Sequence, residues 1–279
     1  MTIVLALVAG ALIGLSLGAL GGGGSILAVP VLVYLLGQTP HQATTGSLVV
    51  VGSTSLIGAV AAYRAGNVAL ARGVAFGVLA IGGAAAGAKA AGLVSQAVLL
   101  ASFSALMLVV AGAMTYRQLH ERGTTSGRRA RGGLGLSAAV DDPIITFSPT
   151  FACRCPQALK VLVTATLVGL LTGFLGVGGG FLVVPALMLG LGLPVQYAAG
   201  TSLVIITLTS ASALAVRAGS AVPPDWGIVL ALTAASALGA VAGARIADRA
   251  DTSRLSAAFT VLVLGVAGYT ASQALPALL

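Results

Sequence analysis

Acidic residues are scarce in this chain, which has six Asp and Glu residues in 279 positions. All six fall in polar segments or near the ends of apolar runs: Glu121, Asp141, Asp142, Asp225, Asp248 and Asp251. Transporters of cations or protons usually keep a carboxylate inside the membrane, so this distribution argues against such a cargo. Charged residues of both signs make up only 7% of the chain, against about 25% in soluble domains. That deficit excludes a soluble globular protein.

Cysteine and histidine are equally rare. Cys153 and Cys155 are one residue apart, and the sequence has no further cysteine to complete a zinc site or a disulfide framework. The two histidines, His41 and His120, lie at the ends of apolar runs. A membrane-embedded serine hydrolase would need a histidine beside a strained serine. We therefore expect no metal, no cofactor and no enzymatic activity.

Apolar sequence is what the chain has in abundance. Its mean hydropathy is +1.07, and several apolar runs reach the ~20 residues that a helix needs to cross a bilayer. The runs are continuously apolar rather than alternating, which indicates an all-α polytopic membrane protein and not a β-barrel. The net charge of +8 does not indicate a nucleic-acid partner. Basic residues cluster between Arg117 and Lys160, as the positive-inside rule predicts for a cytoplasmic loop.

Two glycine clusters interrupt the apolar sequence, and they are copies of one another. Residues 20–30 read LGGGGSILAVP, and residues 175–185 read LGVGGGFLVVP, at an offset of 155. The same offset relates Gly37 to Gly192 and Ser47 to Ser202. Internal duplication is typical of transporter folds. We predict a first membrane repeat at 1–116, a basic cytoplasmic loop at 117–158 and a second repeat at 159–279.

Each repeat should contain one glycine-broken element and three plain spans. The expected spans are Thr44–Tyr63, Val74–Gly92 and Gln96–Tyr116, then Ala199–Val216, Trp226–Arg245 and Leu255–Ala274. If the broken element is a re-entrant hairpin, the two repeats are inverted; if it crosses fully, they are parallel. The distribution of arginines at the loops favours inversion, and the sequence leaves the two arrangements open.

The glycine breaks are the candidate binding site. Two re-entrant tips would meet near the bilayer midplane, and helices starting at Gly24-Ser25 and Gly180-Phe181 would point free N–H groups there, which favours an anion. Hydroxyls where the next spans begin add further donors. The alternative is that these glycines only permit close helix packing. The predicted substrate-binding residues are Gly22, Gly23, Gly24, Ser25, Thr44, Thr45, Ser47, Gly178, Gly179, Gly180, Thr201 and Ser202.

Two arginines complete the candidate set. Arg64 and Arg217 follow the first plain span of each repeat and either attract an anion at the two mouths or cap the ends of their spans. The pattern predicts a secondary carrier of a small oxyanion, with a passive channel for small anions or neutral solutes as the alternative. The expected partners of the protein are the small anionic substrate and the lipid bilayer. The protein could also form a homo-oligomer, which the sequence does not decide.

These motifs resemble the TauE/SafE family of sulfite and organosulfonate transporters. The resemblance is carried by the two glycine clusters with their Val-Pro, by Ala198-Ala199-Gly200-Thr201-Ser202, and by the Arg-x-Gly loops at Arg64 and Arg217. The first-half copy, Ala43-Thr44-Thr45-Gly46-Ser47, departs from the pattern because Thr-Gly replaces Gly-Thr. The resemblance covers nearly the whole chain except the 117–156 loop. It implies transport of a small sulfur-containing anion across a prokaryotic plasma membrane.

Overall fold

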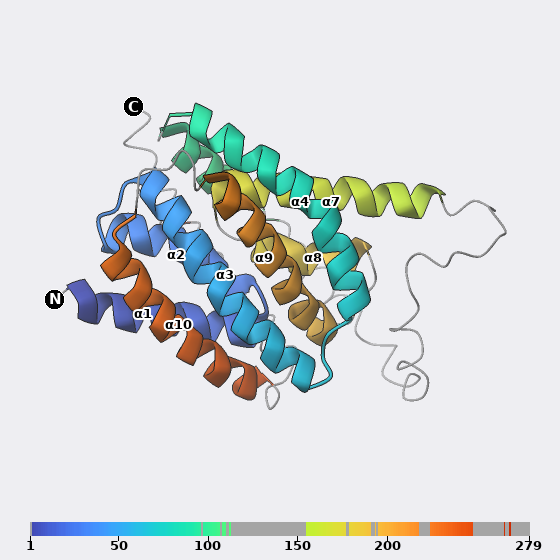
Figure 1. The fold of residues 1–279 in the computed structure, drawn as a ribbon, viewed down its shortest axis with the longest axis horizontal. Coiled ribbons are helices and arrows are strands. Elements are labelled where there is room, and N and C mark those ends of the chain that lie inside the picture. The colour runs from blue at the N-terminus through green and yellow to red at the C-terminus, as the bar shows by residue number, and fades with distance from the viewer. Residues whose placement is uncertain are drawn as a thin grey trace.

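The computed structural model describes residues 2–95, 97–106, 155–176, 179–190, 193, 195–217 and 224–247, with isolated positions at 108, 109, 112, 265 and 268. Every regular element in these ranges is helical (Figure 1). The long helices are α1 (Thr2–Leu20), α3 (Pro40–Arg64), α4 (Leu70–Leu93), α7 (Cys155–Leu175), α9 (Val195–Arg217) and α10 (Trp226–Ala247), and α8 (Gly180–Gly190) is shorter.

Four of these helices contain segments long and apolar enough to cross a membrane: Pro40–Arg64, Leu70–Leu93, Tyr197–Arg217 and Trp226–Ile246. Shorter apolar helices occupy Ile3–Ala19, Gly23–Leu35, Ala97–Leu106 and Val161–Leu175. The prediction of an all-α polytopic membrane protein is confirmed at this level. The expected span Leu255–Ala274, most of Gln96–Tyr116 and the loop up to Arg154, with Cys153, lie outside the described residues. Helix α7 begins at Cys155, inside the segment expected to be loop.

The first helix of each half packs on a helix of the other half. Gly14 and Gly18 of α1 face the backbones of Ser236 and Ala240 of α10. Helix α7 packs on α4 in the same way, with Gly169 against the backbone of Ala80 and Gly173 against that of Ala84. Glycine at these positions lets two helix backbones approach closely, as small residues do in membrane bundles. In both pairs the residue numbers rise together, so the paired helices are parallel.

Helices α3 and α9 occupy corresponding places in the two halves and lie beside each other at the centre (Figure 1). Gly52 of α3 faces Ser210, whereas Gly58, further along α3, faces Leu203, so α3 and α9 run in opposite directions. Helix α3 is parallel to α10, because Gly46 faces Val229 and the Thr54 hydroxyl bonds that of Ser236. Since α1 is also parallel to α10, the segment between α1 and α3 returns toward the side where α1 begins.

The returning segment of the first half is irregular. It consists of a 3₁₀ turn η1 (Gly23–Leu27), one turn of α-helix α2 (Ala28–Pro30) and a π-helical turn η2 (Val31–Leu35). Glycine is a poor helix former, and Pro30 cannot donate a backbone hydrogen bond. The helical segment starts at Gly23, close to the predicted Gly24-Ser25, but it opens as a 3₁₀ turn and not as an α-helix. In the second half, α8 begins at Gly180, where the sequence analysis placed it.

Helix α3 begins earlier than predicted. Thr39 is its N-cap, Pro40 occupies the first turn, and the Thr39 and Gln42 side chains form a capping box with each other's backbone N–H groups. Thr44 to Ser47 consequently lie in the second turn and not at the helix N-terminus. Helix α9 likewise begins at Val195, before Thr201 and Ser202. The prediction that these hydroxyls sit beside free N-terminal amides is wrong.

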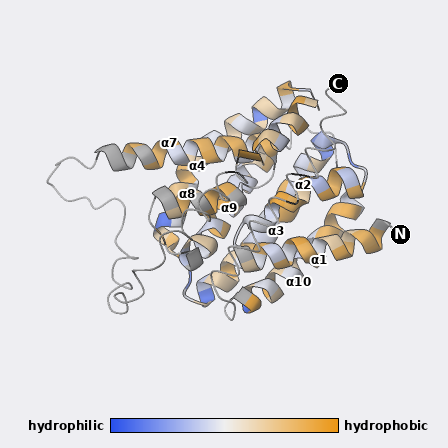
Figure 2. Ribbon diagram, turned by 180° about the vertical axis from the view of Figure 1, so that it is seen from behind, coloured by the Kyte–Doolittle hydropathy of each residue, from blue (hydrophilic) through white to orange (hydrophobic). Residues whose placement is uncertain are grey.

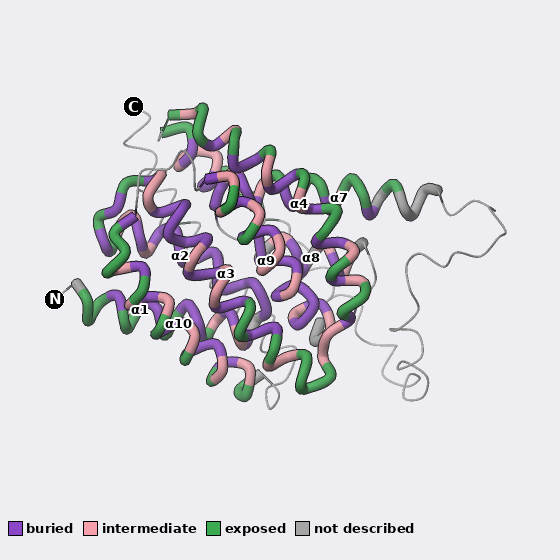
Figure 3. The backbone as a smooth tube through the Cα atoms, viewed as in Figure 1, coloured by how far each residue is buried: buried purple, intermediate pink, exposed green. Residues whose placement is uncertain are grey.

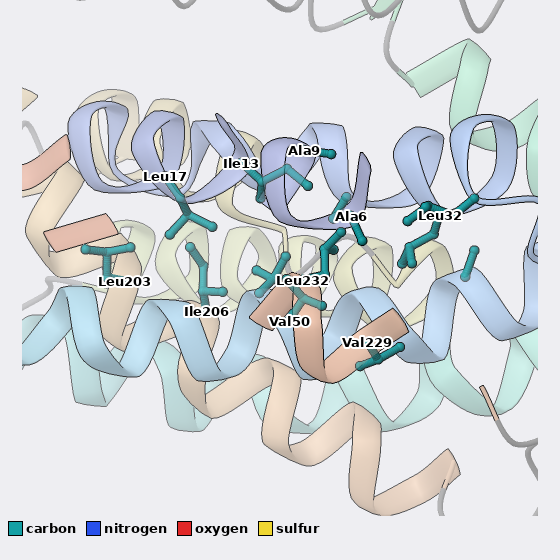
Figure 4. Packing of buried hydrophobic residues seen from close by; sticks show 14 of the residues in the cluster. Ala6, Ala9, Ile13, Leu17, Leu32, Val50, Leu203, Ile206, Val229 and Leu232 are labelled. Atoms are coloured by element: carbon teal, nitrogen blue, oxygen red, sulfur yellow. The ribbon is translucent and has the colours of Figure 1, made fainter. Parts of the chain in front are cut away.

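The core lies where the halves meet, and the outer faces are apolar. In the cluster of Figure 4, Ile13 and Leu17 of α1 lie with Ile206 of α9 and Leu232 of α10, all fully buried. Buried positions concentrate on the inner faces of the central helices (Figure 3), while hydrophobic residues also cover the outside (Figure 2). Leu238 of α10 is 76% exposed, for example. An outer surface this apolar suits contact with lipid acyl chains.

Candidate functional site

The two glycine breaks meet in the structure. A Cβ placed on Gly22 would lie 2.5 Å from the Cα of Gly180, and a Cβ on Gly180 would collide with Gly22 in return. The sequence places these residues more than 150 positions apart, in different halves. Neither position accepts a side chain without backbone movement. The start of α8 is therefore directly against the tip of the first break.

Each break also contacts the helix that follows the other break. Gly21 packs on Ala199 of α9, and a Cβ on Gly176 would lie 2.5 Å from the Cβ of Thr44 of α3. Gly21 and Gly176 have φ of 63° and 67°, a left-handed conformation that other residues rarely adopt. The offset of 155 relates Gly21 to Gly176 and Thr44 to Ala199. The two contacts are thus equivalent in position and different in chemistry.

Arg217, the last residue of α9, is buried beside the second break, with an exposed fraction of 6%. Its Nη1 donates to the Thr44 hydroxyl at 2.8 Å, and its Nη2 donates to the carbonyls of Gly173 at 2.7 Å and of Phe174 at 3.4 Å. These carbonyls lie in the last turn of α7, so the guanidinium caps that helix. Its Nε is buried without a partner among the described residues.

No carboxylate neutralises Arg217 within the described part of the chain. Asp225 is the one acid in these ranges, and it is exposed, with Oδ1 accepting from the backbone of Gly227 at 3.0 Å. The acceptors of the guanidinium are all neutral oxygens. A helix C-terminus supplies only about half of a negative charge. A buried cation in this environment attracts an anion.

Two hydroxyls of α3 border the same place. The Thr44 hydroxyl accepts from Arg217 and donates to the His41 carbonyl at 3.0 Å. The Ser47 hydroxyl lies against the carbonyl oxygens of Gly176 and of Thr44, the latter at 3.0 Å. Both residues are buried. Thr44, Ser47 and Arg217 therefore gather around the second break, and we call these three residues with Gly176 the arginine cluster.

Other predicted residues hold the breaks in shape. Gly24 packs on the backbone of Leu17 in α1, and Gly179 packs on Thr172 in α7, so each supports its tip on the preceding helix. The buried hydroxyl of Ser25 donates to the Gly22 carbonyl at 2.7 Å. Gly23 is buried in the 3₁₀ turn. Gly178 lies outside the described residues.

The remaining predicted residues do not join the arginine cluster. The hydroxyls of Thr45 and Ser202 donate to carbonyls of their own helices, at His41 and Ala199. The Thr201 hydroxyl accepts from the backbone N–H of Ala69 at 3.0 Å and so holds the start of α4. Arg64 is exposed, in contrast to Arg217. The structure thus separates two arginines that the sequence motif treats alike.

Sequence reasoning missed Gly21, Gly173 and Gly176. Gly176 was within the quoted glycine cluster, and its offset from Gly21 was visible, so the pair could have been singled out. The carbonyl of Gly173 carries no sequence signal, because its role depends on where the end of α7 meets Arg217. Within the described residues, no group of three His, Cys, Asp or Glu side chains is placed to hold a metal ion.

An all-helical bundle with an apolar outer surface and a buried polar centre fits a multi-pass membrane protein, and comparison with known proteins adds the function. The family model of the sulfite exporter TauE/SafE matches residues 6–270. The chain belongs to this family. A probable membrane transporter protein of Xylella fastidiosa strain 9a5c is 30% identical over 272 residues, covering 96% of this chain and 94% of that relative.

A second relative has the same description. The probable membrane transporter protein of Xylella fastidiosa strain Temecula1 / ATCC 700964 is 32% identical over 206 residues, which cover 74% of this chain and 70% of the relative. No solved structure matches the chain. The protein is therefore a multi-pass transporter of the cell membrane.

Proposed function

We propose that this transporter is a secondary carrier of a small sulfur-containing oxyanion, of the sulfite or organosulfonate type. The anion would bind between the two glycine breaks, at the arginine cluster. The family name supports sulfur oxyanions as the cargo. The scarcity of acids supports an anion over a cation, since only six acids occur in the chain.

The observation that carries this proposal is the buried guanidinium of Arg217. Arginine offers five N–H donors, and three hydrogen bonds account for its contacts here. Its Nε has no partner among the described residues and so leaves a donor for an anion oxygen. A charged group held 94% out of solvent is costly unless it is paired, and a substrate anion would supply the pairing that no described carboxylate supplies.

The start of α8 is the second support. The first amides of a helix have no partner within it and carry a partial positive charge. Helix α8 has 11 residues and begins at Gly180, against Gly22 of the other half. Arg217 and the start of α8 both belong to the second half, so that half would supply the charged and helix-terminal donors.

We infer that the two halves, 1–116 and 159–279, are inverted repeats with re-entrant breaks. The support is in the helix directions, since α1 and α3 run opposite to their counterparts α7 and α9. With these directions, Arg64, Arg72 and Arg245 fall at one end of the bundle, as does the start of α7, which follows the basic loop. Lys89 and Arg217 fall at the other end. The positive-inside rule assigns the first end to the cytoplasm.

The test is counterflow in proteoliposomes with labelled sulfite. A carrier preloaded with unlabelled sulfite should accumulate the label transiently, whereas a channel should only equilibrate it. Arg217→Gln should lower the initial rate at least about tenfold, the loss expected for a hydrogen bond to a charged group. Arg217→Lys should retain part of the rate. Arg64→Gln, at the exposed counterpart, is the matched control and should leave the rate unchanged.

The cargo can be narrowed on the purified protein. A ligand that binds only the folded state raises Tm, so sulfite, sulfate, thiosulfate, taurine and sulfoacetate can be compared directly. We expect a sulfite or sulfonate to give the largest shift, and Arg217→Gln to abolish that shift. Equal shifts for all five anions, persisting in Arg217→Gln, would contradict the proposed site.

A further inference from the structure

Two buried hydroxyls at the centre of the molecule lack hydrogen-bond partners among the described residues. They belong to Ser55 of α3 and Ser210 of α9, which are 0% and 1% exposed. The offset of 155 that relates the two halves also relates these two serines. Their neighbours are satisfied: the Thr54 hydroxyl pairs with that of Ser236 at 2.7 Å, and the Thr209 hydroxyl donates to the Ile205 carbonyl at 2.9 Å.

Both serines belong to the faces along which α3 and α9 meet. A Cβ on Gly52 would lie 3.1 Å from the Cβ of Ser210 and 3.8 Å from its Oγ, so this side chain faces α3. Ser55 lies between Gly52 and Gly58 at helical spacing, and both glycines face α9. Gly52 faces Ser210, and Ser55 lies three residues after Gly52, which is about one helical turn. The two serines are therefore offset from each other by about one turn along the contact. We call this contact the central seam.

The missing bonds are not a general property of hydroxyls in this bundle. Thr172, Thr209 and Thr233 each donate to the carbonyl four residues earlier in their own helix. Serine can make the same bond, yet neither Ser55 nor Ser210 makes it. A buried hydroxyl without a partner destabilises the state in which it occurs. Two such groups at equivalent positions indicate that another state satisfies them.

We propose that Ser55 and Ser210 form a second binding station for the transported oxyanion, within the central seam. This rests on the proposed function, because the seam joins the two halves whose relative motion would move the substrate. Each hydroxyl donates one hydrogen bond to a different oxygen of the anion when α3 and α9 separate. The two donors are neutral, so they hold the anion more weakly than Arg217 and allow it to leave. A small anion with at least two acceptor oxygens fits this donor pair.

The test compares Ser55→Ala, Ser210→Ala and the double variant with Thr209→Val, which removes a buried hydroxyl that already has a partner. The double variant should raise Tm by about 2–4 °C, since it removes unsatisfied polar groups. Its maximal sulfite transport rate should fall about tenfold. Sulfite binding to the resting protein, which depends on the arginine cluster, should stay within twofold of wild type. Thr209→Val should lower Tm and leave transport per folded molecule unchanged.

The opposite results overturn the inference. If wild type transports sulfite and the double variant transports it at the same maximal rate, the serines are not a station. If the double variant loses Tm and transport in proportion to its folded fraction, their role is structural. If wild type transports none of the sulfur oxyanions above, the proposed function fails first, and the assignment of the station to these anions fails with it.

Discussion

The two glycine breaks share one backbone contact, a left-handed glycine against the helix after the other break, and differ in chemistry. At the second break, Gly176 packs on Thr44, and Arg217 donates to that threonine from the end of α9. At the first break, Gly21 packs on Ala199, which offers no side-chain donor. Arg64, the counterpart of Arg217 in the sequence motif, is exposed. The two breaks thus share the contacts made by Gly21 and Gly176, whereas the polar donors lie on one side.

The difference extends to the neighbouring hydroxyls. Ser47 reaches the Gly176 carbonyl, across the boundary between the halves, whereas its copy Ser202 donates only to Ala199 of its own helix. Thr201 holds the N–H of Ala69, and its copy in the first half is Gly46, which has no hydroxyl. Thr201 and Ser202 of the second half therefore support the fold, whereas Thr44 and Ser47 of the first half join the arginine cluster.

The largest expected effect is on stability, from a substitution where the two breaks contact each other. Gly22→Leu should prevent folding or destabilise the protein by more than the ~1–3 kcal/mol typical of core overpacking, because the nearest atoms are the backbone of Gly180. Gly82→Leu in α4 is the control, since a Cβ there meets nothing within 4 Å. Size-exclusion profiles and Tm in detergent report the result. A monodisperse Gly22→Leu protein with wild-type Tm would contradict the contact.

A smaller effect should separate the two neighbouring threonines of α3. Thr44→Val removes the hydroxyl that accepts from Arg217, and hydrogen bonds to charged groups contribute about 1.5–3 kcal/mol. We expect sulfite transport to fall at least about tenfold. Thr45→Val removes a hydroxyl that donates to the His41 carbonyl of its own helix, so transport should stay near wild type. Equal losses of transport in both variants would show that the hydrogen bond from Arg217 to Thr44 is not what transport depends on.

The smallest effect should come from Thr201, near the first break, and should change stability without changing transport. Thr201→Val removes the hydroxyl that accepts from the Ala69 N–H, and we expect a loss of about 1 kcal/mol in the free energy of unfolding. Thermal unfolding in detergent measures it. Transport per folded molecule should be unchanged. A specific transport defect without a change in Tm would place Thr201 in the binding site and remove the asymmetry between the breaks.

The features that the two halves share could be predicted from the sequence, whereas the differences between the two breaks could not. Hydropathy is sufficient to predict an all-helical membrane protein. The copied glycine clusters also predict that the two breaks lie close together. The burial of Arg217 was not predictable, because Arg64 and Arg217 occupy matching motifs and only the packing of α3 and α7 distinguishes them. The start of α3 lies earlier than predicted because Thr39 and Gln42 form a capping box there.

The glycines show the same limit. Four consecutive glycines indicated a break, but glycine composition does not reveal which atoms approach. The sequence predicts Gly24 and Gly179 as substrate-binding residues, yet both pack on the helix before them. Leucine at either position would therefore test folding and not binding. Arg217 is the better target, because its removal changes the charge of the site.

Calorimetric titration of purified protein with sulfite tests the central claim most directly. Wild type and Arg64→Gln should bind with the same affinity, and Arg217→Gln should bind at least about tenfold more weakly at an equal folded fraction. Wild-type affinity in a folded Arg217→Gln protein would contradict the assignment of the anion to the second break.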